Sequence, residues 1–145
     1  MTKPIFTGVC TALVTPFLEN RLNTPMLRQL IRRQELAGTD ALVICGTTGE
    51  SAALTDAEKL ELFRVSREAI PEGLPFIAGT GSNNTSHAVA LSQAAQELGA
   101  DALLVVSPYY NKATEDGLYR HYRHIAQAVS IPVILYNVPS RTGLD

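Results

Sequence analysis

The chain has no tryptophan, only two cysteines in 145 residues, and no excess of charge of either sign. Twelve basic and 14 acidic side chains leave a formal net charge of −2, which argues against a nucleic-acid or polybasic membrane binder. No apolar run approaches the roughly 20 residues that span a bilayer, and the start Met1-Thr2-Lys3-Pro4 lacks the apolar segment of a signal peptide. Cys10 and Cys45 lie within apolar runs, where a reduced thiol packs as a small hydrophobe. We therefore expect a cytoplasmic protein that binds neither membrane nor nucleic acid.

Apolar runs and helical segments alternate along the whole chain. The runs are continuous rather than alternating with polar residues, which is typical of parallel strands buried on both faces. Between them, apolar residues recur at helical spacing, most clearly at Leu118, Tyr122, Ile125 and Val129. No linker or composition shift interrupts the pattern, so we expect residues 1–145 to belong to one domain without an internal boundary. The expected strands are residues 8–14, 41–45, 75–78, 102–106 and 132–136.

Several helix boundaries carry their own signals. Thr24 followed by Pro25 predicts an N-cap with proline at the first helical position. Residues 55–58 predict a capping box, and Gly38 and Gly99 suit left-handed C-caps. The segment 37–43 also resembles 98–104, with a glycine, an aspartate and a strand in the same order, which indicates a repeated β-α unit.

Two architectures fit this α/β pattern. A doubly wound sheet of five strands is complete at this length. A (β/α)8 TIM barrel typically needs about 250 residues, so this chain would supply about its first five strands and four helices. The pattern alone leaves both open.

Unusual residues gather just after the expected strands, where both architectures place ligands. Residues 46–51 (GTTGES) suit a carboxylate or phosphate, or form a plain structural turn. Residues 79–84 suggest a dinucleotide loop but lack the last glycine of that motif. The adjacent tyrosines of residues 107–111 can anchor an interface, donate hydrogen bonds or simply pack. Tyr136 and Arg141 could combine proton transfer with carboxylate recognition, or be a packed tyrosine and a surface arginine.

Together, four of these segments resemble the dihydrodipicolinate synthase (4-hydroxy-tetrahydrodipicolinate synthase) family. They are GTTGES at 46–51, GTGSN at 79–83, SPYYN at 107–111 and YNVPSRTG at 136–143, and the resemblance runs from about residue 5 to the end. The wider superfamily of pyruvate-dependent class I aldolases, which includes N-acetylneuraminate lyase, shares part of this set. Tyr109-Tyr110-Asn111 and residues 140–143 favour the synthase.

The resemblance implies a (β/α)8 barrel that condenses pyruvate with aspartate 4-semialdehyde in lysine and diaminopimelate biosynthesis. It implies a lyase that uses a Schiff-base lysine on the sixth strand and needs no cofactor or metal. By the same resemblance, Thr47, Tyr110 and Tyr136 would form a proton relay, with Tyr110 contributed across the interface of a homo-oligomer. Thr48 would hold the carboxylate of pyruvate, and Arg141 that of the second substrate.

Some members of the family bind lysine as a feedback inhibitor at the dimer interface. The positions that match their site are Ser51, Ala52, Asp56, Lys59, Asn83, His87 and Tyr109. A solvated first turn of a helix is an equally good interpretation of Asp56 and Lys59.

The chain departs from the family in its lysines. Lys3, Lys59 and Lys112 are its three lysines, and none follows an expected strand as the Schiff-base residue would. We therefore expect a truncated, N-terminal part of the barrel that carries the relay without the nucleophile. Its open edges would make it pair with a complementary half, or exist as a catalytically silent half-barrel that self-associates.

Overall fold

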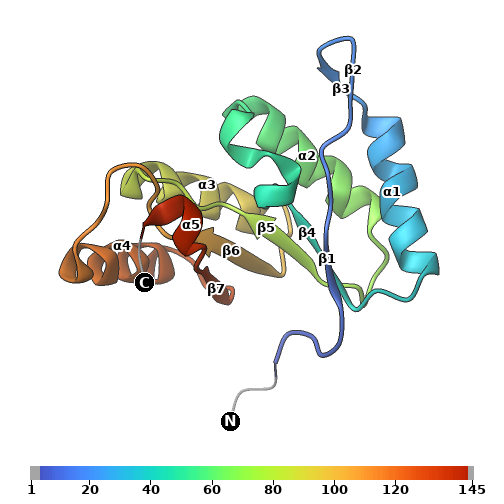
Figure 1. Ribbon diagram of the computed structural model, residues 1–145. Coiled ribbons are helices and arrows are strands. Elements are labelled where there is room, and N and C mark those ends of the chain that lie inside the picture. The colour runs from blue at the N-terminus through green and yellow to red at the C-terminus, as the bar shows by residue number, and fades with distance from the viewer. Residues whose placement is uncertain (1–3, 144–145) are drawn as a thin grey trace.

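The computed structural model describes residues 4–143 and contains a five-stranded parallel sheet (Figure 1). Its strands follow one another in chain order, and each is parallel to the next. A doubly wound sheet would reverse its strand order at a switch point, whereas a barrel adds each strand on the same side. The order therefore selects the barrel and confirms a partial (β/α)8 fold. The strands are β1 (Cys10–Ala12), β4 (Ala41–Ile44), β5 (Phe76–Gly79), β6 (Ala102–Val106) and β7 (Val133–Tyr136).

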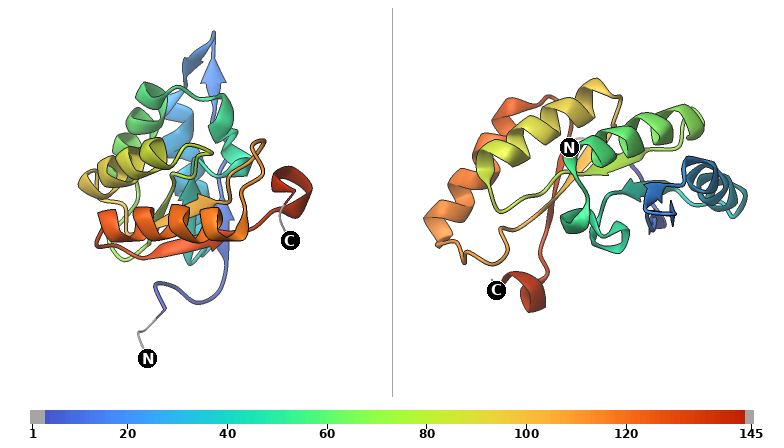
Figure 2. Two further views of the ribbon diagram at one scale, coloured as in Figure 1. Left: turned by 90° about the vertical axis from the view of Figure 1, so that its left-hand side faces the viewer. Right: turned by 90° about the horizontal axis from the view of Figure 1, so that it is seen from above.

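Four long helices cover the outer face of this sheet. Seen from above, they follow one another in an arc, and the short elements after the strands lie on its inner side (Figure 2). The helices are α1 (Thr24–Leu36), α2 (Asp56–Ala69), α3 (Thr85–Glu97) and α4 (Glu115–Ala128). The short elements are the 3-10 turns η1 (Thr47–Gly49) and η2 (Ser51–Ala53) and the helix α5 (Pro139–Thr142).

The two faces of the sheet bury different residues. Large side chains such as Leu42, Phe76 and Leu103 point to the helices and form the main core. Their strand neighbours Val43 and Ile77 belong to a smaller cluster on the inner, concave face. Because both faces carry apolar side chains, the strands read as continuous apolar runs in the sequence.

The strand predictions are confirmed, and one helix boundary is wrong. All five runs form strands, the one at residues 102–106 with the expected bounds. At α1, Asn23 and not Thr24 is the N-cap, because the Asn23 side chain accepts a bond from the Met26 amide. Asn is as good a cap as Thr, and a cap one residue earlier still leaves Pro25 in the first turn.

Other boundary predictions are confirmed. Thr55 and Glu58 form the capping box of α2. Gly38 and Gly99 follow α1 and α3 with φ of +76° and +86°, as left-handed C-caps require.

A hairpin before α1 is missing from the sequence expectations. It pairs β2 (Phe17–Leu18) with β3 (Arg21–Leu22) in antiparallel fashion. Its two turn residues, Glu19 and Asn20, both have positive φ, as a two-residue hairpin loop needs. The turn contains no glycine, and its strands are only two residues long, so no sequence signal marks it.

The repeated Gly-x-Asp segment has a structural reason. The Asp40 carboxylate accepts a bond of 2.7 Å from the Val9 amide, and Asp101 accepts one of 2.8 Å from the Phe76 amide. In each unit, the aspartate before a strand thus binds the backbone at the start of the preceding strand. The repeat fixes strand register at the amino end of the sheet.

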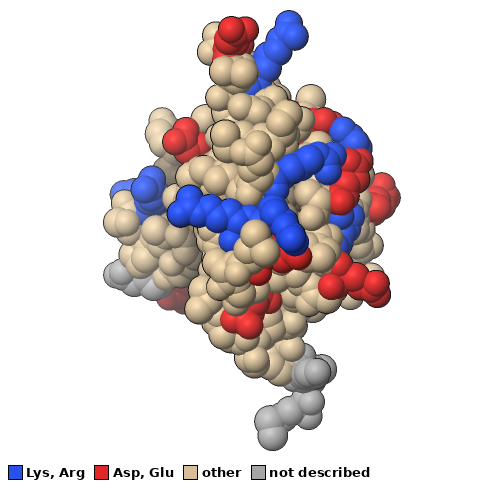
Figure 3. Space-filling model, turned by 90° about the vertical axis from the view of Figure 1, so that its right-hand side faces the viewer, with Lys and Arg blue, Asp and Glu red and all other residues tan. Residues whose placement is uncertain are grey.

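The face that α1 covers carries mixed charge (Figure 3). Arg28 pairs with Glu68 of α2, and Arg32 pairs with Glu35 within α1. Within the described part of the chain, no helix is both long and apolar enough to cross a membrane.

Candidate active site

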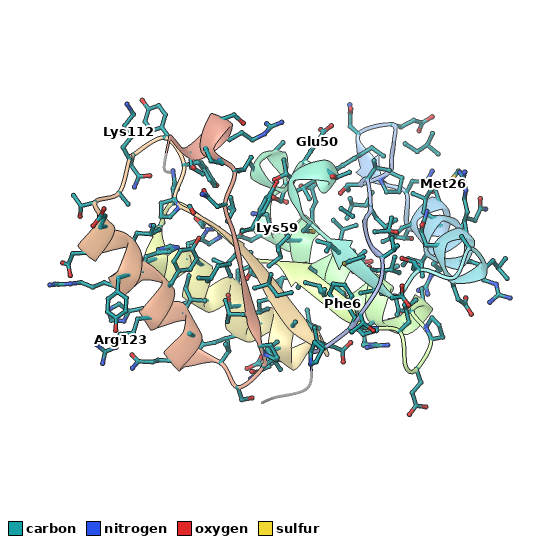
Figure 4. All side chains as sticks on the ribbon, turned by 60° about the horizontal axis from the view of Figure 1, so that its bottom comes forward. Phe6, Met26, Glu50, Lys59, Lys112 and Arg123 are labelled. Atoms are coloured by element: carbon teal, nitrogen blue, oxygen red, sulfur yellow. The ribbon has the colours of Figure 1, made fainter. Side chains whose placement is uncertain are left out.

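The segments rich in polar residues all follow the carboxyl ends of strands. Figure 4 shows Glu50, after β4, and Lys112, after β6, along one edge of the sheet, with Phe6 toward the other end. The segments after β5 and β7 leave the same edge because all five strands are parallel. The sequence expectation that these polar segments gather at one end of the sheet is confirmed.

A cavity of about 550 Å³ opens at this edge between η1, η2, the loop after β6 and α5. It brings together residues from three loops that are far apart in the sequence. Hydroxyl, carboxylate and guanidinium groups line it beside small apolar side chains. The lining residues are Thr47, Glu50, Ser51, Ala52, Ala53, Val106, Tyr109, Val138, Arg141 and Thr142.

The turn after β4 presents Thr47 and Thr48 to solvent. It begins at Cys45, which is buried and has a φ of +59°. The Gly49 amide binds the Gly46 carbonyl at 3.0 Å, and the Thr15 hydroxyl donates to the Gly49 carbonyl at 2.7 Å. These bonds close η1 and connect it to the segment after β1, so the turn that carries both threonines is held in place by hydrogen bonds.

The glycines after β5 serve close backbone packing. A Cβ at Gly79 would overlap the carbonyl oxygen of Cys45, and one at Gly81 would lie 2.5 Å from the Val106 amide nitrogen. The resemblance of residues 79–84 to a dinucleotide loop therefore has another physical origin: the glycines let three neighbouring strand ends approach one another.

The loop after β6 carries two tyrosines with opposite environments. Tyr109 is half-buried and lines the cavity. Tyr110 is 92% exposed and has a φ of +72°, so its ring projects away from the body of the chain. Asn83 donates to the Tyr109 carbonyl at 3.3 Å, and Asn111 donates to the Asn83 carbonyl at 3.2 Å.

The segment after β7 supplies a phenol and a cation. Tyr136 ends the strand in register with Val106, a lining residue of the cavity. Arg141 lies in α5, whose turn is closed by the bond from its amide to the Val138 carbonyl. The guanidinium of Arg141 is exposed and makes no ion pair within residues 4–143, so it is available to an anion entering the cavity.

The structure brings together only part of the predicted catalytic and substrate set. Thr47 and Arg141 share the cavity, whereas Thr48, Tyr110 and Tyr136 do not line it. Among the hydrogen bonds of residues 4–143, none joins the hydroxyls of Thr47, Tyr110 and Tyr136, so the relay stays a prediction.

Sequence reasoning missed five lining residues: Glu50, Ala53, Val106, Val138 and Thr142. Glu50 has a φ of +55° between the two 3-10 turns, and its place directly after Gly49 was the available signal. Nothing in the sequence marks Val138 or Thr142 as cavity residues, because α5 alone turns them inward.

The residues that match the family's effector site lie beside this cavity. Ser51, Ala52 and Tyr109 line it, and Asn83 binds the Tyr109 backbone. His87 does not line the cavity. Its side chain belongs to a separate small polar cluster, in which four side chains from two helices and a loop meet.

In this cluster the His87 ring binds Asp56 at 2.8 Å and Ser82 at 3.0 Å. The ammonium of Lys59 lies 3.8 Å from the same Asp56 carboxylate, although Lys59 is only 7% exposed. Asp56 is therefore more than part of a solvated first turn, since it links α2 to α3 through His87, while the buried Lys59 pairs with it within α2.

Neither described lysine is placed as a nucleophile on a strand end. Lys59 lies inside the molecule on α2, and Lys112 is exposed at the tip of the loop after β6 (Figure 4). Lys3 lies outside the described residues. Burial raises the pKa of the Cys45 thiol to about 12, opposed in part by Lys59, so this cysteine stays protonated. Within residues 4–143, no group of His, Cys, Asp and Glu side chains could hold a metal ion.

Comparison with known proteins gives one consistent family. The model of the dihydrodipicolinate synthetase family matches residues 5–145. A 4-hydroxy-tetrahydrodipicolinate synthase from Acetivibrio thermocellus is 52% identical over all 145 residues, which cover 50% of that protein. Another from Lachnoclostridium phytofermentans is 55% identical over 142 residues, 97% of this chain and 48% of the relative.

Solved structures agree with the sequence relatives. The dihydrodipicolinate synthase from Cyanidioschyzon merolae with lysine bound superposes with a TM-score of 0.95 at 42% identity, over 99% of this chain and 49% of that one. The chloride-inhibited dihydrodipicolinate synthase from Acinetobacter baumannii complexed with pyruvate superposes with a TM-score of 0.92 at 45% identity, over 95% of this chain and 48% of that one. The chain thus spans about half the length of the relatives and structures that it matches.

Proposed function

Because the chain belongs to the dihydrodipicolinate synthetase family, we propose that it forms one half of a barrel that condenses pyruvate with aspartate 4-semialdehyde. The product would be 4-hydroxy-tetrahydrodipicolinate, an intermediate of lysine and diaminopimelate biosynthesis. The cavity that joins Thr47 of η1 to Arg141 of α5 carries this proposal. It places a hydroxyl group and a guanidinium that makes no ion pair within residues 4–143 around one space, as a reaction between two carboxylate-bearing substrates requires.

The chemistry needs an amine at a strand end, and neither lysine within residues 4–143 occupies such a place. A lysine of the complementary half would attack the carbonyl carbon of pyruvate, and loss of water would give an imine. The methyl group would then lose a proton, and the resulting enamine would attack the aldehyde carbon, whose oxygen takes up a proton. The amine of the semialdehyde would finally add to the imine carbon and expel the lysine, which closes the ring of the product and frees the lysine. Enzymes that form Schiff bases use a lysine whose pKa is lowered by burial or a nearby cation. The exposed tip at Lys112 supplies neither.

This chain would supply proton transfer and substrate binding. In our proposal the hydroxyls of Thr47, Tyr136 and a partner copy's Tyr110 move the proton, because hydroxyls in series can do so without a buried charge. Thr48 and the amides of η1 would hold the pyruvate carboxylate. Arg141 would hold the carboxylate of the second substrate through paired N–H bonds.

The exposure of Tyr110 favours a homo-oligomer. A tyrosine ring that is 92% exposed on a fixed loop has the character of an interface anchor. We propose that the Tyr109-Tyr110 loop contacts a second copy. We also place the protein in the cytoplasm, where its two free cysteines would stay reduced.

Lysine is a second candidate ligand, at Ser51, Ala52, Asn83, His87 and Tyr109. The structure from Cyanidioschyzon merolae with lysine bound favours this possibility. The Asp56 carboxylate already binds His87 and Lys59, which leaves it less able to hold the amine of a ligand. Calorimetry with lysine, repeated on His87→Ala, would detect a site that depends on this cluster.

Complementation tests the proposal. The chain is mixed with the second half of the Acetivibrio thermocellus synthase, and product formation from both substrates is measured. We expect activity only in the mixture. Arg141→Ala should lower kcat/KM by about 10- to 100-fold, the loss of a charge-assisted bond. Arg123→Ala, an exposed arginine outside the cavity, is the matched control and should leave kcat/KM unchanged.

Borohydride trapping with pyruvate then locates the amine. Intact mass should show an adduct on the added half and none on this chain. A stable adduct on this chain alone would contradict the proposed division of labour. A mixture that assembles without any activity would instead support the catalytically silent half-barrel.

A further inference from the structure

The loop of residues 107–112 holds Tyr110 in an unfavourable backbone conformation. Tyr110 has a φ of +72° and Lys112 one of +43°, in the left-handed region that side chains with a Cβ rarely adopt. Because the Tyr110 ring is 92% exposed, its own packing within the chain cannot hold the loop there. Other contacts must do so.

Two asparagine side chains clamp this loop from the neighbouring strand end. Asn83 lies after β5, and its side-chain amide donates to the Tyr109 carbonyl at 3.3 Å. In return, the side chain of Asn111 donates to the backbone carbonyl of Asn83 at 3.2 Å. The Asn111 backbone amide also reaches the Tyr109 carbonyl at 3.0 Å. The bonds thus fall on both sides of Tyr110 and fix the residues before and after it.

The base of the loop is held independently. The Ser107 hydroxyl and the Tyr122 hydroxyl of α4 lie 2.9 Å apart, and the Ser107 amide donates to the Tyr136 carbonyl at 3.1 Å. The freedom of the loop is therefore confined to its tip, residues 109–112, where the asparagine bonds act.

We propose that Asn83 and Asn111 are positioning residues whose paired bonds keep Tyr110 extended toward a second copy, ready for proton transfer there. This inference rests on the proposed function, in which Tyr110 completes a partner's site. Both asparagines act as donors to backbone carbonyls. A carboxylate at either position would have nearly the same shape but would place an oxygen against an oxygen. Asn83→Asp and Asn111→Asp therefore remove the clamp with the smallest change of volume.

The first test uses the chain alone. Amide hydrogen exchange is measured for residues 109–112 and, as an internal reference, for β5 and β6. We expect both variants to speed exchange at the loop by at least about tenfold, the loss of roughly one hydrogen bond, with the strands unchanged. The matched control is Asn84→Asp. Asn84 caps α3 by accepting from the His87 amide, and an aspartate can do the same.

The second test uses the complemented barrel. A positioning role predicts a kcat lower by about tenfold with KM for pyruvate unchanged, because Tyr110 acts in the chemical step and not in binding. Unchanged loop exchange in both variants overturns the clamp, whatever the activity. Faster loop exchange with normal kcat overturns the positioning role. Absence of activity in the unsubstituted mixture counts against the proposed function alone, since the exchange measurement still decides the clamp.

Discussion

At the scale of single residues, the candidate site depends on one close approach. Cys45 directly follows β4 and lies in the left-handed region, and Gly79 of β5 lies directly against its carbonyl. This contact leaves no room for a Cβ, so the glycine sets the path of the turn that carries Thr47 and Thr48.

Gly79→Ala should therefore destabilise the chain strongly. The added methyl would overlap the Cys45 carbonyl, and overpacking against backbone costs about 3 kcal/mol or more of unfolding free energy. Gly73→Ala is the control. Gly73 has a φ of +87° with open space around it, so this substitution should lower the unfolding free energy by only about 1–2 kcal/mol. Urea unfolding measures both, and equal losses would refute the steric account.

The two cysteines should differ in reactivity. Burial raises the pKa of Cys10 and raises that of Cys45 to about 12, so we expect Cys45 to resist iodoacetamide at pH 8 until the chain is unfolded. Cys10 is only half-buried and should react first. Peptide mass mapping distinguishes the two sites, and early labelling of Cys45 would contradict its burial.

The same shift links stability to alkaline pH. A thiol whose pKa is higher in the folded state than in the unfolded state stabilises the fold. This stabilisation is fully present below the ordinary thiol pKa of 9.0. That contribution is lost as pH rises from about 9 toward 12. The melting temperature should fall over this range, and less steeply in Cys45→Ala; parallel curves for the two proteins would count against this assignment.

At the scale of elements, the helices begin where short polar side chains satisfy backbone amides. Asn23, Thr55, Asn84 and Thr114 all accept a bond from the first turn of the helix that follows. Only α2 adds a returning glutamate, which makes its start the most strongly specified.

Thr55→Ala should lower the unfolding free energy by about 1 kcal/mol, because the Glu58 amide loses the Thr55 hydroxyl that accepts its hydrogen bond. Thr55→Ser keeps the hydroxyl and should lower the unfolding free energy by only a few tenths of a kcal/mol. Thermal unfolding of the unsubstituted chain and the two variants gives their order of stability. A serine variant as unstable as the alanine variant would show that the methyl group, and not the cap, matters.

At the scale of the whole molecule, the sheet curves without closing. Leu135 of β7 pairs in register with the buried Val105, yet it is 61% exposed because β7 is the last strand of the described sheet. Such an edge, with apolar side chains beside unpaired backbone groups, invites association with another chain.

The chain by itself should therefore self-associate at about 100 µM, where exposed apolar surface begins to drive assembly. Leu135→Lys should weaken the association measured by sedimentation without lowering thermal stability. Leu36→Lys, at an exposed leucine on α1, is the matched control and should change association less. A folded monomer for the unsubstituted chain would refute this expectation.

The sequence by itself determined the five strands of the parallel sheet, the α/β class and the end of the sheet where the polar loops lie. These follow from local rules, since buried parallel strands are continuously apolar and the loops after them are polar. Capping residues likewise act within one turn, although Asn23 displaced the expected Thr24.

The resemblance to the family favoured the barrel over the doubly wound sheet, which the apolar pattern alone had left open. The tertiary structure confirmed the barrel through its strand order, which depends on crossovers that no local pattern records. It also decided that Thr47 and Arg141 share a cavity and that Glu50, Val138 and Thr142 join them. Those neighbours come from separate loops, and their distance in space is set by the curvature of the sheet. The balanced charge and the lack of long apolar runs argued against nucleic-acid and membrane binders, and the packing of the strand ends formed the candidate site.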